Sequence, residues 1–416
     1  MIRIARDEYR RRIDRLRSEV DEADLDLFLV TSLDSIYYLT GTGFEPLERP
    51  FFLLIGSGAG RGPVLLVPRL DGEHMGKARD VVGEIHTYRE YPAPEGRRWI
   101  DRLRTLIGPA RHIGIEPSLR LEVADELRDL STRIVPLVER LRLTKSEAEV
   151  AMIRRAARYA DRGVEQLLAA SYAGAMVAEG FARTGRLTKA IIHDLEDWEP
   201  LTNRVLMATW AAPRSAQPHS IPSLIDRLGD GPHVALALLR VNGYAAESER
   251  TYFTSPPSEE MRRAFRAMEE ARRVAFRRIR PGVPCGELDS AVNEFLRAEG
   301  YHGEECRLHR TGHGIGLGNH EAPWIAEGST DLLDEGMVIS IEPGVYLPGM
   351  GGYRHSDTVL VTGDGCECLT TSPTDLETLT MRGWKPMARI PGRIVRHAMG
   401  LDRKDRQLHA SPTPGR

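Results

Sequence analysis

The sequence predicts a smaller α/β domain followed by a larger α+β domain. A chain of 416 residues is too long for one ordinary hydrophobic core, which indicates two domains. Helical and strand patterns alternate over the first part of the chain, whereas strands in the second part follow one another through short connections. Such a succession is typical of an antiparallel sheet with helices packed on it. We therefore expect domains at residues 1–142 and 143–380, followed by a basic extension at 381–416.

The predicted N-terminal domain alternates helices with buried strands. A charged helix is expected at residues 3–22, and the apolar run at 24–32 predicts a buried strand. The apolar segments 50–56 and 62–68 flank a glycine-rich turn and predict a strand pair. At the boundary, residues 144–147 (TKSE) resemble a capping box, so a long amphipathic helix is expected to begin there.

The predicted C-terminal domain combines strands with two amphipathic helices. Apolar stretches with short connections mark the strands, and apolar residues at helical spacing mark the helices. The expected strands span residues 233–239, 243–253, 337–347 and 357–362, and the expected helices span 258–279 and 285–300.

The composition argues against several classes of function. A formal net charge of −3 gives no reason to expect nucleic acid or a membrane as partner. No apolar run is long enough to span a bilayer, and the N-terminal stretch is charged throughout, unlike a signal peptide. Four cysteines in so long a chain do not make a disulfide framework, so a cytoplasmic location is expected. Residues 381–416 carry nine Lys and Arg against Asp402 and Asp405, and we expect a solvated, partly disordered extension.

Two histidines, His313 and His320, lie seven residues apart in the glycine-rich segment 312–323 (GHGIGLGNHEAP), and each could bind a metal or move a proton. This segment, with 243–253 (GYAAESERTYF) and 336–362 (GMVISIEPGVYLPGMGGYRHSDTVLVT), resembles the creatinase, prolidase and aminopeptidase P superfamily. The resemblance extends from about residue 10 to about residue 376. It implies the pita-bread fold for the α+β C-terminal domain and a smaller creatinase-like α/β N-terminal domain.

In the metallopeptidase branch of this superfamily, two metal ions are held by two Asp, one His and two Glu side chains. Hard divalent cations need several carboxylates, and a water between the ions becomes the nucleophile. The resemblance places the five ligand positions at Leu236, Glu247, His313, Glu342 and Ser356. Two ligands are thus lost, and a paired metal centre is not expected. One divalent metal at Glu247, His313 and Glu342 is the alternative, because a catalytic zinc needs only three protein ligands.

The metal-free creatinase branch is the closer resemblance in the pattern of site residues. The segment QPHSIP places His219 where a proton-shuttling histidine is expected, and ESERT places Glu249 where a carboxylate grips a guanidinium. Glu342 would face Glu249, and two such carboxylates need a cation between them, which the substrate would supply. His219 would act as general acid and base, with His313 and His320 as polar contacts and a proton relay. The resemblance implies a hydrolase without metal or other cofactor that cleaves a C–N bond in a small amidine, guanidine or cyclic nitrogen compound.

Further residues are expected to bind this small-molecule substrate. Arg49 resembles an arginine that reaches the active site of the neighbouring subunit, so we expect a homodimer with Arg49 crossing between subunits. Trp324 could stack on a flat or cationic group. The other expected contacts are Glu247, Arg354 and His355.

Several alternatives stay open on the sequence. His219 could be a surface turn residue, and Glu247 or Glu249 could simply pair with Arg250 or Arg354. The departures from the creatinase pattern, which make creatine itself an unexpected substrate, are at Ala245, Trp324 and Ser356. The second candidate function is a metal-dependent Xaa-Pro dipeptidase or aminopeptidase with a reduced metal site. The third is an inactive member of the superfamily that binds a small molecule.

Overall fold

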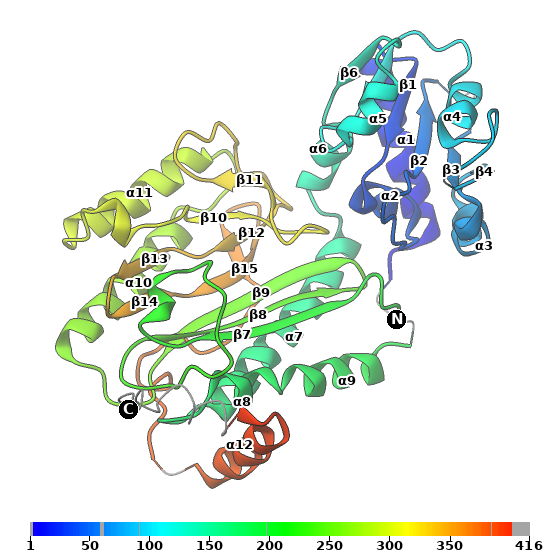
Figure 1. The fold of residues 1–416 in the computed structure, drawn as a ribbon. Coiled ribbons are helices and arrows are strands. Elements are labelled where there is room, and N and C mark those ends of the chain that lie inside the picture. Colours follow the sequence, from blue (N-terminus) through cyan, green and yellow to red (C-terminus); the bar gives the residue numbers. More distant parts are fainter. Residues whose placement is uncertain (1–2, 59–61, 91, 197, 384, 402–416) are drawn as a thin grey trace, which may run out of the picture. The chain divides into compact units, whose positions relative to one another are not determined.

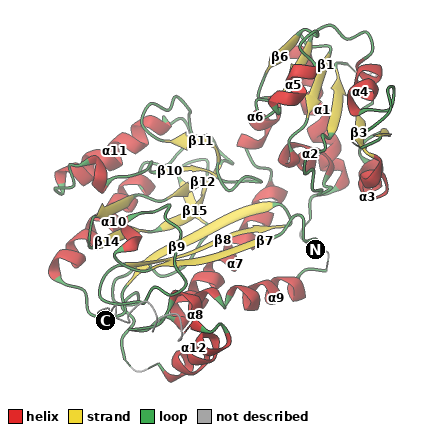
Figure 2. Ribbon diagram, in the orientation of Figure 1, coloured by secondary structure: helices red, strands yellow, loops and turns green. Residues whose placement is uncertain are grey.

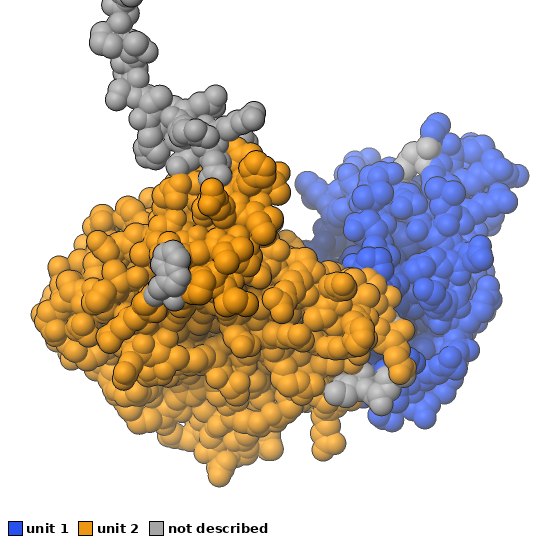
Figure 3. Space-filling view, turned by 90° about the horizontal axis from the view of Figure 1, so that it is seen from below, with its two compact units in different colours: residues 1–143, 199–202 blue, residues 144–198, 203–416 orange. Residues whose placement is uncertain are grey.

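The computed structural model describes residues 3–58, 62–90, 92–196, 198–383 and 385–401. The chain forms two compact units, which Figure 3 colours separately. The first unit comprises residues 1–143 and 199–202, and the second comprises residues 144–198 and 203–416. Both units combine helices with strands (Figure 2).

A six-stranded sheet in the order β4-β3-β2-β1-β5-β6 organises the first unit (Figure 1). β2 pairs antiparallel with β1 and with β3, which confirms the strand pair predicted around the glycine-rich turn. The core is apolar and includes Phe52, whose ring centroid lies 5.6 Å from that of Trp99. The strands are β1 (Leu27–Val30), β2 (Phe52–Gly56), β3 (Val64–Pro68), β4 (Glu84–Tyr88), β5 (Ile113–Ile115) and β6 (Thr132–Ile134). The α-helices are α1 (Arg6–Glu22), α2 (Leu33–Thr40), α3 (Gly72–Met75), α4 (Trp99–Ile107), α5 (Leu121–Glu126) and α6 (Leu137–Leu143).

An antiparallel sheet in the order β11-β10-β12-β15-β9-β8-β7, with β16 paired to β15, organises the second unit. The antiparallel pairing confirms the α+β architecture predicted for this part of the chain. The strands are β7 (Arg204–Trp210), β8 (His233–Val241), β9 (Tyr244–Tyr252), β10 (Gly312–Gly314), β11 (Glu321–Ile325), β12 (Val338–Ile341), β15 (Ser356–Val361) and β16 (Cys366–Cys368), with β13 (Gly344–Leu347) and β14 (Gly351–Arg354) as a separate pair. The α-helices are α7 (Glu147–Ala170), α8 (Val177–Phe181), α9 (Thr184–Asp194), α10 (Glu259–Phe276), α11 (Cys285–Ala298) and α12 (Pro386–Ala398).

Helix α7 packs along β8 and β9 and covers one face of the large sheet (Figure 1). Its capping box is formed by Ser146 and Glu149, two residues later than the sequence predicted. The reason is that Thr144 forms a β-bridge with Met337, so the chain is still extended there. The close approach of helix and sheet requires Gly163, where a Cβ would lie 2.7 Å from the Cβ of Ala237. Helix α7 does not cover the opposite face of β8 and β9, which is therefore available for a functional site.

A buried ion-pair network ties β9 to β15 and α10. The side chain of Arg250 is 1% exposed, and its Nη2 lies 2.7 Å from Oδ1 of Asp357. The Nε of Arg272 lies 2.6 Å from the other oxygen of the same carboxylate. Burial by itself would raise the pKa of Asp357, but Arg250 and Arg272 outweigh it and hold this pKa well below its usual range. Asp357 is therefore ionised in the folded chain at neutral pH.

This network predicts how stability depends on pH. A carboxylate whose pKa is lowered on folding stabilises the chain above its unfolded pKa of about 4, and the contribution is lost as pH falls towards the folded value. We expect the urea midpoint of the wild type to fall as pH decreases below about 4, and to fall less steeply in Asp357→Asn. Urea denaturation at neutral pH and at about pH 3 measures this, with the exposed Asp364→Asn as control. An equal decrease of the urea midpoint between these two pH values in Asp357→Asn and wild type would contradict the prediction.

The C-terminal extension contains a helix that the sequence did not predict. Helix α12 packs on α8, and Arg396 forms an ion pair with the buried Glu179. The hydroxyl of Tyr172 accepts a hydrogen bond from Arg396 at 3.1 Å. A proline inside the helix, Pro391, obscures its pattern in the sequence. Asp402 and the residues after it lie outside the described part of the chain. None of the described helices is long and apolar enough to cross a membrane.

Candidate active site

The candidate active site lies on the face of the large sheet that points away from α7. Side chains alternate between the two faces of a strand, and Ala237 faces α7, so Leu236 and Leu238 point to the other face. The register pairs Leu236 with Glu249 and Leu238 with Glu247. Both glutamates of β9 therefore project into the same space as the two leucines.

A cavity of about 310 Å³ opens on this face of the sheet. It combines three carboxylates, several imidazole and guanidinium groups, and an apolar wall. Its lining residues are Leu206, Trp210, Pro218, His219, Ser220, Leu236, Leu238, Glu247, Glu249, His309, Arg310, His320, Glu342 and Arg354. Six of the ten predicted site residues are among them, although together they span more than a hundred residues of the sequence.

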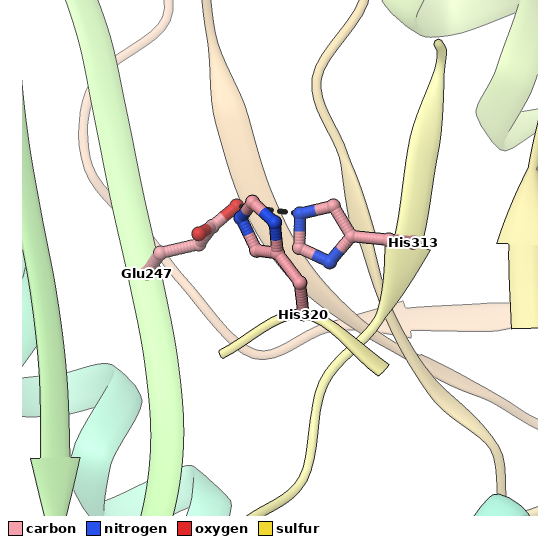
Figure 4. Close-up of side chains that lie close together, drawn as sticks. All are labelled: Glu247, His313 and His320. Carbon is pink, nitrogen blue, oxygen red and sulfur yellow. Dashed lines mark ion pairs between the residues drawn. The ribbon is translucent and has the colours of Figure 1, made fainter. Parts of the chain in front are cut away.

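Glu247, His313 and His320 form a compact group of possible ligands beside the cavity (Figure 4). One ligand atom from each residue lies within 4.8 Å of the other two. The rings of His313 and His320 have centroids 4.0 Å apart, and Nε2 of His313 lies 3.9 Å from Oε1 of Glu247. His313 donates from Nδ1 to the carbonyl oxygen of Gly314 at 3.0 Å, so Nε2 is the ring nitrogen that faces Glu247. No described residue hydrogen-bonds to this buried Nε2.

The electrostatics around His313 favour a cation. Its Nε2 lies 3.3 Å from Oε1 of Glu342 as well as facing Glu247. Burial by itself would lower the pKa of His313, but these two carboxylates outweigh it and raise the pKa. Partial burial, with His313 and Arg310 nearby, lowers the pKa of His320 to about 4, so His320 is a neutral imidazole.

Arg354 lies between Glu249 and Glu342. Its Nε and Nη2 donate to both oxygens of Glu249 at 2.5 and 2.7 Å, and its Nη1 lies 3.8 Å from Oε2 of Glu342. The alternative in which Glu249 pairs with Arg354 is thereby confirmed. The two carboxylates predicted to grip a cationic substrate already have a guanidinium of this chain between them. Burial raises the pKa of Glu249 against the opposing effect of Arg354.

His309 is a cavity residue that sequence reasoning missed. Its Nδ1 lies 2.7 Å from the carbonyl oxygen of Arg310, and its Nε2 lies 2.5 Å from the hydroxyl of Tyr346. Burial lowers the pKa of His309 to about 4 and raises that of Tyr346, so the tyrosine hydroxyl donates to a neutral imidazole. Arg354 Nη1 also approaches Nε2 of His309 at 3.2 Å. The available signal was its position four residues before His313 in the segment HRTGH.

The other predicted site residues lie in different surroundings. His219 is exposed and lies at the edge of the cavity. Trp324 is 40% exposed and its ring lies under the guanidinium of Arg310. His355 does not line the cavity, because it follows Arg354 in extended chain and points to the opposite side, where its ring packs edge-on against Phe265.

Arg49 belongs to the first unit. Its Nη1 lies 2.7 Å from Oδ2 of Asp71, and its side chain is 13% exposed. Its role across a dimer interface stays a prediction.

The residues present do not fit a two-metal centre. Leu236 and Ser356 stand at two of the five ligand positions, and an aliphatic side chain cannot bind a cation. The hydroxyls of Ser340 and Ser356 both donate to Oε1 of Glu247, at 2.6 and 2.7 Å. The residues do fit a single cation, because one carboxylate and two imidazoles are the donors of many catalytic zinc sites. The third member of that group is His320, where the sequence suggested Glu342, although Oε1 of Glu342 also lies 3.3 Å from Nε2 of His313.

The fold and the site define a class of protein: two-domain hydrolases with a pita-bread C-terminal domain. The model of metallopeptidase family M24 matches residues 151–363, and that of the creatinase/prolidase N-terminal domain matches residues 12–144. The chain belongs to metallopeptidase family M24.

Relatives of the chain include dipeptidases and prolidases. An Xaa-Pro dipeptidase of Pyrococcus furiosus is 29% identical over 88% of this chain and 99% of the relative. The prolidase of Pyrococcus horikoshii is 27% identical over 88% of this chain and 99% of its own, with a TM-score of 0.75. The dipeptidase PepE of Mycobacterium ulcerans is 27% identical over 90% and 98%, with a TM-score of 0.76. The predicted closeness to the creatinase branch is therefore not supported, and the superfamily itself is confirmed.

Proposed function

We propose that the protein is a dipeptidase-like hydrolase of C–N bonds that uses one divalent cation held by Glu247, His313 and His320. The observation that carries this proposal is the buried Nε2 of His313, which has no hydrogen-bond partner among the described residues and lies beside a carboxylate and a second imidazole. The Xaa-Pro dipeptidase relatives support the same reaction class.

Different side chains of the cavity can perform the separate steps of amide hydrolysis. A divalent cation bound to the three ligands would act as a Lewis acid on the carbonyl of the scissile bond. Glu342 is the carboxylate placed to take the proton of the attacking water. It is ionised, because His313, His309 and Arg354 outweigh burial and hold its pKa well below the usual range. His219, at the edge of the cavity, returns a proton to the leaving nitrogen. Arg354 keeps Glu249 and Glu342 from repelling each other.

A second candidate is the metal-independent hydrolysis of a C–N bond in a small amidine, guanidine or cyclic nitrogen compound. Its support is that Leu236 and Ser356 stand where the resemblance implies two carboxylate ligands of a metal centre. In this alternative His219 would be the general base, without a cation at His313.

One experiment separates the two candidates. The purified protein is analysed for bound Mn, Fe, Co and Zn, and its activity is measured by mass spectrometry on a panel of Xaa-Pro and other dipeptides. We expect about one equivalent of metal per chain, and activity that a chelator removes and the metal restores. Dipeptide hydrolysis by metal-free protein, unaffected by chelation, would exclude the cation. Inactivity on every dipeptide, with turnover of a cyclic amidine, would favour the second candidate.

A further inference from the structure

Helix α12 presents an apolar stripe to the solvent. Met387, Ile390 and Ile394 are 85%, 64% and 64% exposed, and they follow one another at spacings of three and four residues. Residues at these spacings lie on one face of a helix. Large apolar side chains that are exposed singly are ordinary, but a row of them on one helix face indicates a surface that binds a partner.

The opposite face of α12 is held by the body of the second unit. Gly392 is buried directly against Glu179, where a Cβ would collide with the carboxylate. Arg396 forms an ion pair with the same carboxylate, and the guanidinium carbon of Arg389 lies 4.3 Å from the ring centroid of Tyr172. The helix is therefore docked beside α8 with its apolar stripe outward (Figure 1). A partner of the stripe has to approach from outside the molecule.

The charge around this stripe is positive. Residues 381–401 contain no Asp or Glu, and Arg382 and Arg393 are exposed. Residues 381–416 together carry nine Lys and Arg against two Asp. The whole chain carries 57 Lys and Arg against 60 Asp and Glu, so the rest of the chain has ten more acidic than basic side chains. The small net charge thus averages two regions of opposite sign and does not describe the surface around α12.

We propose that α12 binds reversibly to the surface of a membrane that contains anionic lipids. An apolar stripe flanked by cations is typical of helices that lie in the plane of the membrane interface, with apolar side chains among the acyl chains and cations at the headgroups. A flat partner suits a helix whose inner face is already packed on the protein. A second copy of the chain suits it less, because two such helices side by side would bring like charges together. The family models end at residues 144 and 363, so this surface belongs to the extension and not to the M24 domain.

Co-sedimentation of the full chain with lipid vesicles tests this proposal. One set of vesicles consists of phosphatidylcholine alone, and the other contains about 30% phosphatidylglycerol, which supplies the negative surface charge. We expect the wild type to bind the anionic vesicles about 10-fold more tightly than the neutral ones, the effect of one or two cations near the surface. The binding should weaken as the NaCl concentration rises, because salt screens the charges of protein and lipid from each other.

Variants of the stripe and of its flank measure the two contributions separately. The double variant Ile390→Ser with Ile394→Ser should weaken binding to the anionic vesicles at least about 10-fold, because two apolar side chains no longer enter the interface. Arg393→Gln should weaken it about 5-fold, the effect of one cation near the surface. The matched controls in the first unit are Leu121→Ser and Arg128→Gln, whose side chains are also strongly exposed, and neither should change the binding. Circular dichroism and the thermal midpoint show whether each variant is folded.

The possible outcomes decide between a membrane and other partners of the stripe. Binding of the wild type to anionic vesicles that the serine double variant loses would support the proposal. Failure of the wild type to bind these vesicles, or equal binding by the double variant, would overturn it. A dimer in lipid-free buffer, seen by sedimentation velocity and abolished by the double variant, would also overturn it, because a second copy would then cover the stripe. None of these measurements depends on catalytic activity or on metal content.

Discussion

Replacement of His313 by alanine is expected to remove the bound cation and to reduce turnover about 10³-fold. His313 is fully buried and is the member of the ligand group that faces both Glu247 and Glu342. Without its Nε2, a cation would keep one carboxylate and one partly exposed imidazole, too few ligands for a stable site. The rate estimate follows because a bound metal stabilises the transition state by several kcal/mol, and each 1.4 kcal/mol is worth about tenfold.

Metal content per chain and kcat/KM on the best dipeptide of the panel measure this effect. His193→Ala is the control, because His193 is an 88% exposed histidine on α9. His313→Gln fills the space more fully than alanine and separates loss of the ligand from an unfilled cavity. A His313→Ala protein that keeps a full equivalent of metal would show that the cation is not held here. One that loses its metal but keeps its turnover would refute the catalytic role of the cation.

Replacement of Arg250 by alanine is expected to cost about 3–5 kcal/mol in the free energy of unfolding, the largest effect on stability that we predict. The guanidinium is buried and donates to four carbonyl oxygens and to Asp357. Its loss would remove these hydrogen bonds and leave Asp357 with Arg272 and the hydroxyl of Thr370 as partners. Breaking a buried ion pair from one side is costly because the remaining charge stays buried.

Urea denaturation of wild type and Arg250→Ala at neutral pH measures this cost. Arg273→Ala is the control: Arg273 is a 60% exposed arginine on α10, and its loss should change the free energy of unfolding by less than about 1 kcal/mol. A loss of under about 1 kcal/mol in Arg250→Ala would mean that water replaces the guanidinium at little cost.

The position of Glu249 shows why the predicted role of the site changed. Its placement on the cavity face follows from strand periodicity, which acts over neighbouring residues. Its partner, Arg354, lies 105 residues later in the chain. Nothing in the local sequence indicates that this arginine, rather than a substrate, pairs with the carboxylate of Glu249. The metal-free mechanism required that Glu249 and Glu342 have no cation of the chain between them, so that a cationic substrate could bind there.

The sequence by itself determined the division into two domains, the antiparallel second sheet and six of the residues that line the cavity. Hydrophobic periodicity and glycine-rich turns carry this information locally, and the motifs around Glu247, His313 and Glu342 locate the site. Only the tertiary structure decided which charges are paired. Glu249 with Arg354, Arg310 above Trp324, and His320 beside His313 are contacts between strands and loops, fixed by sheet register and packing. In a partly buried cavity such pairings decide which side chains are left for the substrate, because a buried charge must find its partner in space.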